Sequence, residues 1–218
     1  MGRAALPRRL RAGGAALALA LLSCEDPAGE ASLPPLVEVP QPATPRDVAV
    51  LDVEGFGEVR IELLADLAPV TAAHFAALAR RDYYDGTTFH RVVPVFLVQG
   101  GDPLTRDRDP RNDGVGGGKE RVADERPSLS LVRGIVALAN TGVANSAGAQ
   151  FFILVSDARH LDGHYAVFGR VSTGMDVVDR IALTPRDEYG RLGPVDRPLT
   201  NVVVTDVRIE RAQPGADP

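Results

Sequence analysis

The sequence predicts a mainly β fold: a closed eight-stranded antiparallel β-barrel capped by two α-helices. One observation behind this prediction is a series of short apolar runs separated by turn residues. A second is that only two segments have helical character. All of these runs fall within residues 47–211, a length that can bury a large core without disulfide bonds or metal ions.

The expected strands are short runs rich in β-branched and aromatic residues. In the first of them, residues 48–53, the apolar residues alternate, and Gly55 and Gly57 then mark a turn into the second. The eight strands expected on these grounds are residues 48–53, 58–63, 88–92, 96–100, 135–139, 150–155, 166–169 and 202–210.

Two helices are expected between these strands. The first starts at Pro69, because proline is favoured at the first helical position, and runs to about Arg80. The second covers residues 175–181. The side chains expected to face the core are Val70, Ala73, Phe75, Ala77 and Leu78 in the first helix, and Val177, Val178 and Ile181 in the second.

The N-terminus carries an export signal rather than part of the fold. Residues 1–11 are basic and precede an apolar run, residues 12–22, that is too short to span a bilayer stably. The run leads into the sequence LLSC, which resembles the signal of bacterial lipoproteins, and Cys24 is the only cysteine of the chain. We expect residues 1–23 to be a lipoprotein signal peptide and Cys24 to be lipidated. The alternatives are a cleaved secretory signal without lipid and an apolar helix retained as an anchor.

The next segment, residues 24–46, is expected to be an acidic, proline-rich tether, since six prolines leave it unable to build a core. Residues 212–218 form an expected disordered tail. This organisation predicts a protein of the bacterial cell envelope, attached to a membrane through its lipid alone, on the periplasmic side or the outer surface. A soluble secreted or periplasmic protein is the alternative.

The charge balance argues against nucleic acid as a partner. The chain has 24 basic and 29 acidic residues, and four of the arginines lie in the first 11 positions. The rest of the chain is therefore acidic and would be repelled by phosphate backbones and anionic lipids. A single cysteine also excludes an internal disulfide bond and a multi-cysteine metal site.

Metal-dependent and serine-dependent hydrolysis are only weakly indicated. His160 and His164 have the spacing of a helical metal pair, but Gly163 lies between them and no further ligand is evident. Ser146 lacks the sequence pattern that surrounds a serine nucleophile. We therefore expect no metal site.

Several segments resemble motifs of one family. FHRVVPVFLVQGGD, residues 89–102, resembles the signature of the cyclophilin-type peptidyl-prolyl cis/trans isomerases, and GIVALAN (residues 134–140) and QFFI (residues 150–153) resemble two of the family's barrel strands. With shorter matches, the resemblance covers residues 47–211 in the family's order. It implies a cyclophilin-like barrel that accelerates rotation about X-Pro bonds of exported or envelope proteins and assists their folding.

The resemblance also implies roles for individual residues. Arg91 would stabilise the twisted transition state, and Gln99 would contact the substrate and orient Arg91. The residues implied to line the proline pocket are Phe96, Leu97, Phe152 and Leu161. The other substrate-binding residues implied are Ala139 and Asn140 through the main chain, Gln150 at a neighbouring subsite, and His160 and Tyr165, which stand where the family often has Trp and His. Leu138, Phe151 and Phe168, by contrast, are expected in the core.

The partners implied by the resemblance are proline-containing polypeptides, bound by a monomer without a cofactor. Because His160 replaces a large aromatic residue, we expect weak cyclosporin binding. Two other functions remain open: a binding module that holds proline-containing segments with little turnover, and an envelope lipoprotein whose barrel is a docking platform. Arg91 favours the enzyme, since binding alone does not require this side chain.

Overall fold

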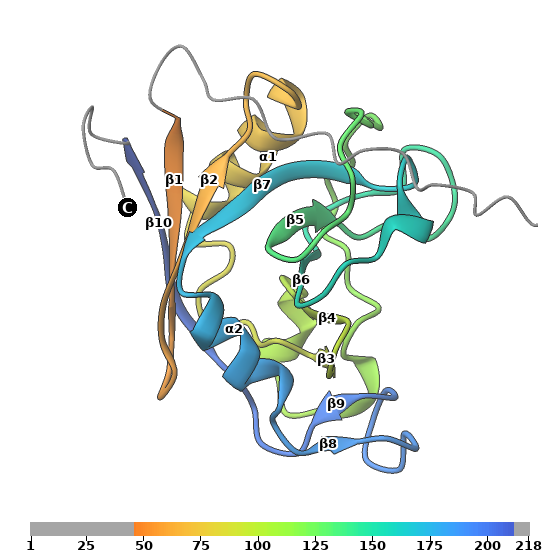
Figure 1. Ribbon diagram of the computed structural model, residues 1–218. Coiled ribbons are helices and arrows are strands. Elements are labelled where there is room, and N and C mark those ends of the chain that lie inside the picture. Colours follow the sequence, from red (N-terminus) through yellow and green to blue (C-terminus); the bar gives the residue numbers. More distant parts are fainter. Residues whose placement is uncertain (1–45, 212–218) are drawn as a thin grey trace, which may run out of the picture. The chain divides into compact units, whose positions relative to one another are not determined.

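The apolar runs of the sequence pair into one curled antiparallel sheet in the computed structural model, which describes residues 46–211 (Figure 1). The predicted mainly β fold with eight strands and two helices is confirmed. The strands are β1 (Asp47–Val53), β2 (Gly57–Leu63), β3 (Arg91–Val93), β4 (Leu97–Gly100), β5 (Ile135–Leu138), β6 (Phe151–Leu154), β7 (Ala166–Thr173) and β10 (Val204–Arg211). Their order across the sheet is β10-β1-β2-β7-β5-β6-β4-β3.

The closure of the barrel is less regular than expected. Within residues 46–211, no ladder joins the two outermost strands, β3 and β10. The gap is bridged by the segment before β3: Thr88 pairs with Val203 in an isolated bridge, and the Phe89 N–H donates to the Val202 carbonyl (2.9 Å). The expected strand 88–92 is therefore divided, because its second half bonds to a different segment.

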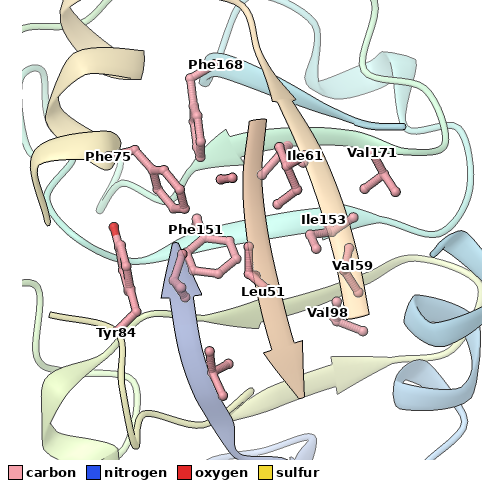
Figure 2. Close-up of a cluster of buried hydrophobic side chains, with 14 of the residues drawn as sticks. Leu51, Val59, Ile61, Phe75, Tyr84, Val98, Phe151, Ile153, Phe168 and Val171 are labelled. Atoms are coloured by element: carbon pink, nitrogen blue, oxygen red, sulfur yellow. The ribbon is translucent and has the colours of Figure 1, made fainter. Parts of the chain in front are cut away.

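The interior of the curled sheet holds the larger of two hydrophobic clusters, named here the barrel core (Figure 2). The Phe75 ring lies 4.9 Å from that of Tyr84, 4.7 Å from that of Phe168 and 5.5 Å from that of Phe151, measured between centroids. Leu138, Phe151 and Phe168 are buried in this cluster, as expected. Phe75 and Tyr84 come from the segment between β2 and β3, Phe151 from β6 and Phe168 from β7, so distant segments of the described residues meet on one set of aromatic rings.

Helix α1 (Pro69–Ala79) and helix α2 (Met175–Ala182) cover opposite ends of the curled sheet (Figure 1). The buried residues expected in α2 are confirmed. In α1 the prediction is wrong for Val70, Ala73 and Ala77, which are exposed. This helix is apolar on nearly all sides, so its periodicity does not identify the inner face. The buried residues are Thr71, Ala72, Phe75, Ala76, Leu78 and Ala79.

A distant carboxylate fixes the start of α1. Both oxygens of Glu125 accept backbone N–H groups, Oε1 from Val70 (3.1 Å) and Oε2 from Thr71 (2.6 Å). These N–H groups have no partner within the helix, and a negative charge is favourable at a helix N-terminus. Glu125 thereby attaches the long 102–133 loop to the barrel.

The remaining elements are short. A second, two-stranded sheet is formed by β8 (Arg186–Asp187) and β9 (Arg197–Pro198), and it was not expected from the sequence. The 3₁₀ helices are η1 (Pro103–Arg106), η2 (Pro110–Asn112) and η3 (Arg159–Leu161). Neither these nor the α-helices of residues 46–211 combine the length and apolar character needed to cross a bilayer.

The expected boundaries can be compared only in part. The domain's contacts begin at Arg46, a buried residue that forms ion pairs with Glu62 (3.2 Å) and Asp66 (2.7 Å). The expected signal peptide, most of the tether, Cys24 and residues 212–218 lie outside the described residues.

Candidate functional site

The register of four strands aligns the expected catalytic residues on one face of the sheet. Arg91 of β3 pairs with Gln99 of β4, Gln99 pairs with Phe152 of β6, and Phe152 pairs with Ala137 of β5. Residues that face each other across neighbouring strands direct their side chains to the same side. Phe151 points into the barrel core, so the alternation places Phe152, and with it Gln99 and Arg91, on the opposite side. This side is called the outer face.

A second hydrophobic cluster, the outer apolar cluster, lies on this face. Its buried floor includes Leu97 and Phe152, which are 4% and 3% exposed. The expected substrate-binding residues packed around that floor, all partly buried, are Phe96, Ala139, Leu161 and Tyr165. The structure thus brings the four residues expected to hold a proline ring into one cluster.

Aromatic contacts set the edges of the outer apolar cluster. Tyr165 meets Phe152 edge to face, with centroids 5.0 Å apart and an interplanar angle of 85°. The exposed ring of His160 is nearly parallel to that of Phe96, at 6.4 Å. His160 and Tyr165 therefore lie at the rim of the outer apolar cluster, each against one of its aromatic rings.

Two glutamines form a polar arm beside the cluster. The Gln99 amide Nε2 donates to Gln150 Oε1 (2.9 Å), and Gln150 Nε2 donates to the carbonyls of Gly116 (2.6 Å) and Gly114 (3.0 Å). A side chain at Gly116 would collide with a neighbouring part of the loop, since its Cβ would lie 2.1 Å from Asp102 Oδ1. Gln150 thus joins the sheet to the glycine-rich part of the 102–133 loop.

A small cavity of about 160 Å³ opens next to the polar arm. Its lining includes Gln99, Arg121, Ala139, Asn140, Ser146 and Gln150. The Asn140 side chain is engaged on both ends, donating to the His164 carbonyl (3.0 Å) and accepting from the Gly142 N–H (3.0 Å). Gln150, expected at the neighbouring subsite, and Ala139 and Asn140, expected to bind the peptide main chain, therefore line the same cavity as Gln99.

Arg91 lies at one end of the row of cross-strand pairs Arg91–Gln99–Phe152. Its side chain is 39% exposed, and its Nε lies 3.9 Å from Oδ2 of Asp196, a residue that the sequence analysis did not select. No periodicity marks Asp196, since it lies in the irregular segment between α2 and β10. A partly exposed guanidinium beside an apolar floor can donate hydrogen bonds to a group bound on that floor.

The structure gives little support to a serine nucleophile or a metal site. The Ser146 hydroxyl donates to the Val143 carbonyl (2.6 Å) and accepts from the Thr141 N–H (3.0 Å), so it is occupied within its own turn. Throughout residues 46–211, no three His, Cys, Asp or Glu side chains lie close enough together to hold a metal ion.

His90, the neighbour of Arg91, is a buried base that the sequence analysis also missed. It is 3% exposed, and neither ring nitrogen has a hydrogen-bond partner among the described residues. Burial lowers the pKa of His90 to about 4, although the nearby Asp113 carboxylate acts in the opposite direction. His90 is therefore neutral near pH 7 and leaves Arg91 as the cation of this segment.

This buried histidine predicts a pH-dependent stability. The unfolded chain protonates His90 near pH 6.5, whereas the folded protein does so near pH 4, so the unfolded state binds more protons between these values. We expect the free energy of unfolding to fall by about 3 kcal/mol from this residue as the pH drops from 7 to 4. Urea titrations should show this loss reduced in His90→Leu and retained in His160→Leu, which changes an exposed histidine. An equal loss in all three proteins would contradict the prediction.

Comparison with known proteins places these features in a family context. The family model "Cyclophilin type peptidyl-prolyl cis-trans isomerase/CLD" matches residues 48–209. A peptidyl-prolyl cis-trans isomerase-like 1 of Rhizopus delemar is 41% identical over 167 residues, which cover 76% of this chain and 98% of that protein. A peptidyl-prolyl cis-trans isomerase of Acinetobacter baylyi is 35% identical over 158 residues, covering 70% of this chain and 81% of that protein.

Solved structures agree with this similarity. The crystal structure of a cyclophilin type peptidyl-prolyl cis-trans isomerase of Cryptosporidium parvum matches with a TM-score of 0.67 at 28% identity, covering 77% of this chain and 99% of that one. Its structure in the presence of the dipeptide ala-pro matches with a TM-score of 0.63 at 27% identity, covering 75% of this chain and 98% of that one.

Proposed function

Because the chain belongs to the cyclophilin-type peptidyl-prolyl cis-trans isomerases, we propose that the outer face of its sheet is the surface on which it acts. The activity is the cis/trans isomerisation of X-Pro bonds, and proline-containing polypeptides are its substrates. The observation that carries the assignment of the site is the row Arg91–Gln99–Phe152 beside the outer apolar cluster.

The reaction requires no covalent chemistry. Amide resonance sets a rotation barrier of about 18–20 kcal/mol, and uncatalysed X-Pro isomerisation takes tens to hundreds of seconds. In the twisted transition state, resonance is lost and the proline nitrogen regains a lone pair. A donor held at that nitrogen stabilises the twisted form more than the planar ground state and so accelerates the rotation.

The outer apolar cluster, Arg91 and Gln99 have different roles in this stabilisation. The outer apolar cluster binds the proline ring, whose burial fixes the position of the nitrogen. Arg91 donates a hydrogen bond to that nitrogen as it becomes pyramidal. Since Gln99 Nε2 donates to Gln150, the side-chain oxygen Oε1 of Gln99 is left to accept a hydrogen bond from Arg91 on the neighbouring strand. Lowering the barrier by about 7 kcal/mol in this way corresponds to a rate increase of about 10⁵-fold.

NMR exchange spectroscopy on a short Ala-Pro peptide tests the assignment against the binding-module alternative. Catalytic amounts of the full chain should accelerate cis/trans exchange, and the peptide should shift resonances of Phe152, Gln99 and Tyr165. Peptide-induced shifts without acceleration would favour the binding module. Acceleration with shifts confined to other surfaces would contradict the placement of the site.

The N-terminal sequence supports a location in the cell envelope, and with it a class of protein substrates. The basic and apolar start of the chain and the LLSC sequence support a lipid anchor at Cys24, and the proline-rich residues that follow would hold the domain away from the membrane. The clients are then exported or envelope proteins whose folding waits for X-Pro isomerisation. The domain acts as a monomer, and His160 at the pocket rim makes cyclosporin a weak ligand.

Replacing Cys24 by serine tests the anchor. A serine cannot take the thioether-linked lipid, so Cys24→Ser should leave the membrane fraction or accumulate as the unprocessed precursor. The matched control is Ser23→Ala, which keeps a small residue before the cysteine and should fractionate like the wild type. Normal processing together with unchanged membrane fractionation of Cys24→Ser would refute lipidation.

A further inference from the structure

The β8–β9 hairpin brings an acidic side chain to Arg91. Strand β9 lies beside β3 (Figure 1), and the N–H of Val92, next to Arg91, donates to the carbonyl of Asp196 (2.9 Å). The Asp196 side chain is 18% exposed, and its Oδ2 lies 3.9 Å from Arg91 Nε. Backbone and carboxylate of one residue therefore contact two consecutive residues of β3.

The Asp196 carboxylate is held from its other side. Its Oδ1 accepts from Arg186 Nε at 3.0 Å, so the two oxygens face two different arginines. The backbone of Asp196 has a φ of 65°, in the left-handed region that few non-glycine residues adopt. Such a conformation persists only where neighbouring contacts enforce it, and here the Asp196 N–H donates to the Asp187 carbonyl (2.9 Å).

The hairpin itself is fixed to the body of the protein. Arg197 Nε donates to Asp113 Oδ2 at 2.6 Å, and the two side chains are only 16% and 4% exposed. The Asp187 carboxylate closes the hairpin loop by accepting the N–H groups of Tyr189 (3.3 Å) and Leu192 (2.5 Å). Asp196 therefore lies in a hairpin that these side-chain contacts hold in place.

We propose that Asp196 is a positioning residue that orients the Arg91 guanidinium for isomerisation, an inference that rests on the proposed role of Arg91. Oδ2 faces Nε, the stem end of the guanidinium, which leaves the terminal Nη groups for the Gln99 side chain and the substrate. Arg186 shares the negative charge of Asp196, so the carboxylate orients Arg91 without neutralising its positive charge. An ordered donor reaches the proline nitrogen without first losing side-chain freedom.

Asp196→Asn is the direct test, since it keeps the shape and removes the charge. We expect the catalysed exchange rate of an Ala-Pro peptide to fall about tenfold, with the peptide Kd changed less than about twofold. The Arg91 Nε–H resonance of the full chain, assigned with Arg91→Lys, should shift in Asp196→Asn without any peptide present. The matched control is Asp206→Asn, an ion-paired surface aspartate of β10, which should leave both the rate and the Arg91 resonance unchanged.

A double-mutant cycle separates positioning from a structural role. Lysine at position 91 has no Nε–H of the guanidinium type, so Asp196→Asn should cost less than about twofold in the Arg91→Lys background. An equal loss in both backgrounds, or an Arg91 Nε–H resonance unmoved by Asp196→Asn, would overturn the proposal. A different result would show that the proposed role of Arg91 is itself wrong: Arg91→Ala would then retain full activity, whether or not Asp196 is changed.

Discussion

Replacing Arg91 by alanine is expected to lower kcat/KM for X-Pro isomerisation by about 10²–10³-fold, the range found when one transition-state donor is removed. The loss should fall on kcat, because the donor acts on the twisted state and the outer apolar cluster still binds the planar peptide. Peak intensities in NMR exchange spectra give the catalysed exchange rate, and titration with the peptide gives the Kd. Together the two measurements separate a loss of turnover from a loss of binding.

A surface arginine provides the control for this substitution. Arg80 is exposed and lies just after α1, where it pairs with Asp47 (3.5 Å), so Arg80→Ala removes the same charge from a different place. We expect Arg80→Ala to isomerise peptides like the wild type. If Arg91→Ala retained the wild-type rate, the proposed mechanism would be wrong while the enzymatic activity itself would stand. A large rise in the Kd would instead assign Arg91 to substrate binding.

The outer face shows why much of this site was predictable from the sequence. In the segment FHRVVPVFLVQGGD, Arg91 and Gln99 flank a short turn, and a tight antiparallel pair places them opposite each other. Strict alternation then separates Phe151 from Phe152, since consecutive residues of a strand point to opposite faces. Local spacing therefore accounts for the Arg91–Gln99 pair, whereas Phe152 joins the row through the long-range pairing of β4 with β6, and its place in the site was implied by the family resemblance.

Asp196 shows why the rest was not predictable. It reaches Arg91 through a hairpin of two-residue strands, and its position depends on the Arg197–Asp113 pair, which joins residues 84 positions apart. No local periodicity encodes such a contact. The same holds for Glu125 at the start of α1, and for the division of residues 88–92 between two partners. Long-range polar contacts of irregular segments thus account for these differences.

Consecutive phenylalanines allow the two faces of the sheet to be tested separately. The Phe151 ring is 1% exposed and packs edge-on against Phe75 (5.5 Å) and Tyr84 (5.6 Å) in the barrel core. Phe151→Ala should lower the free energy of unfolding by about 3–5 kcal/mol, because the enclosed cavity cannot be filled by water. The peptide Kd of the protein that remains folded should change less than about twofold, since Phe151 faces away from the site.

Phe152→Ala should give the opposite pattern. Phe152 lies on the outer face, where its ring contacts Tyr165 at 5.0 Å, and its removal opens a space that solvent can enter. We expect a smaller loss of stability than in Phe151→Ala and a peptide Kd raised about tenfold or more, since burial of the proline ring against an aromatic side chain is lost. Urea titration and peptide titration measure the two effects, and Phe151→Leu replaces Phe151→Ala if the latter does not fold. Should Phe151→Leu weaken peptide binding as much as Phe152→Ala does, the two faces would not be independent, and the outer apolar cluster could not be the proline pocket on its own.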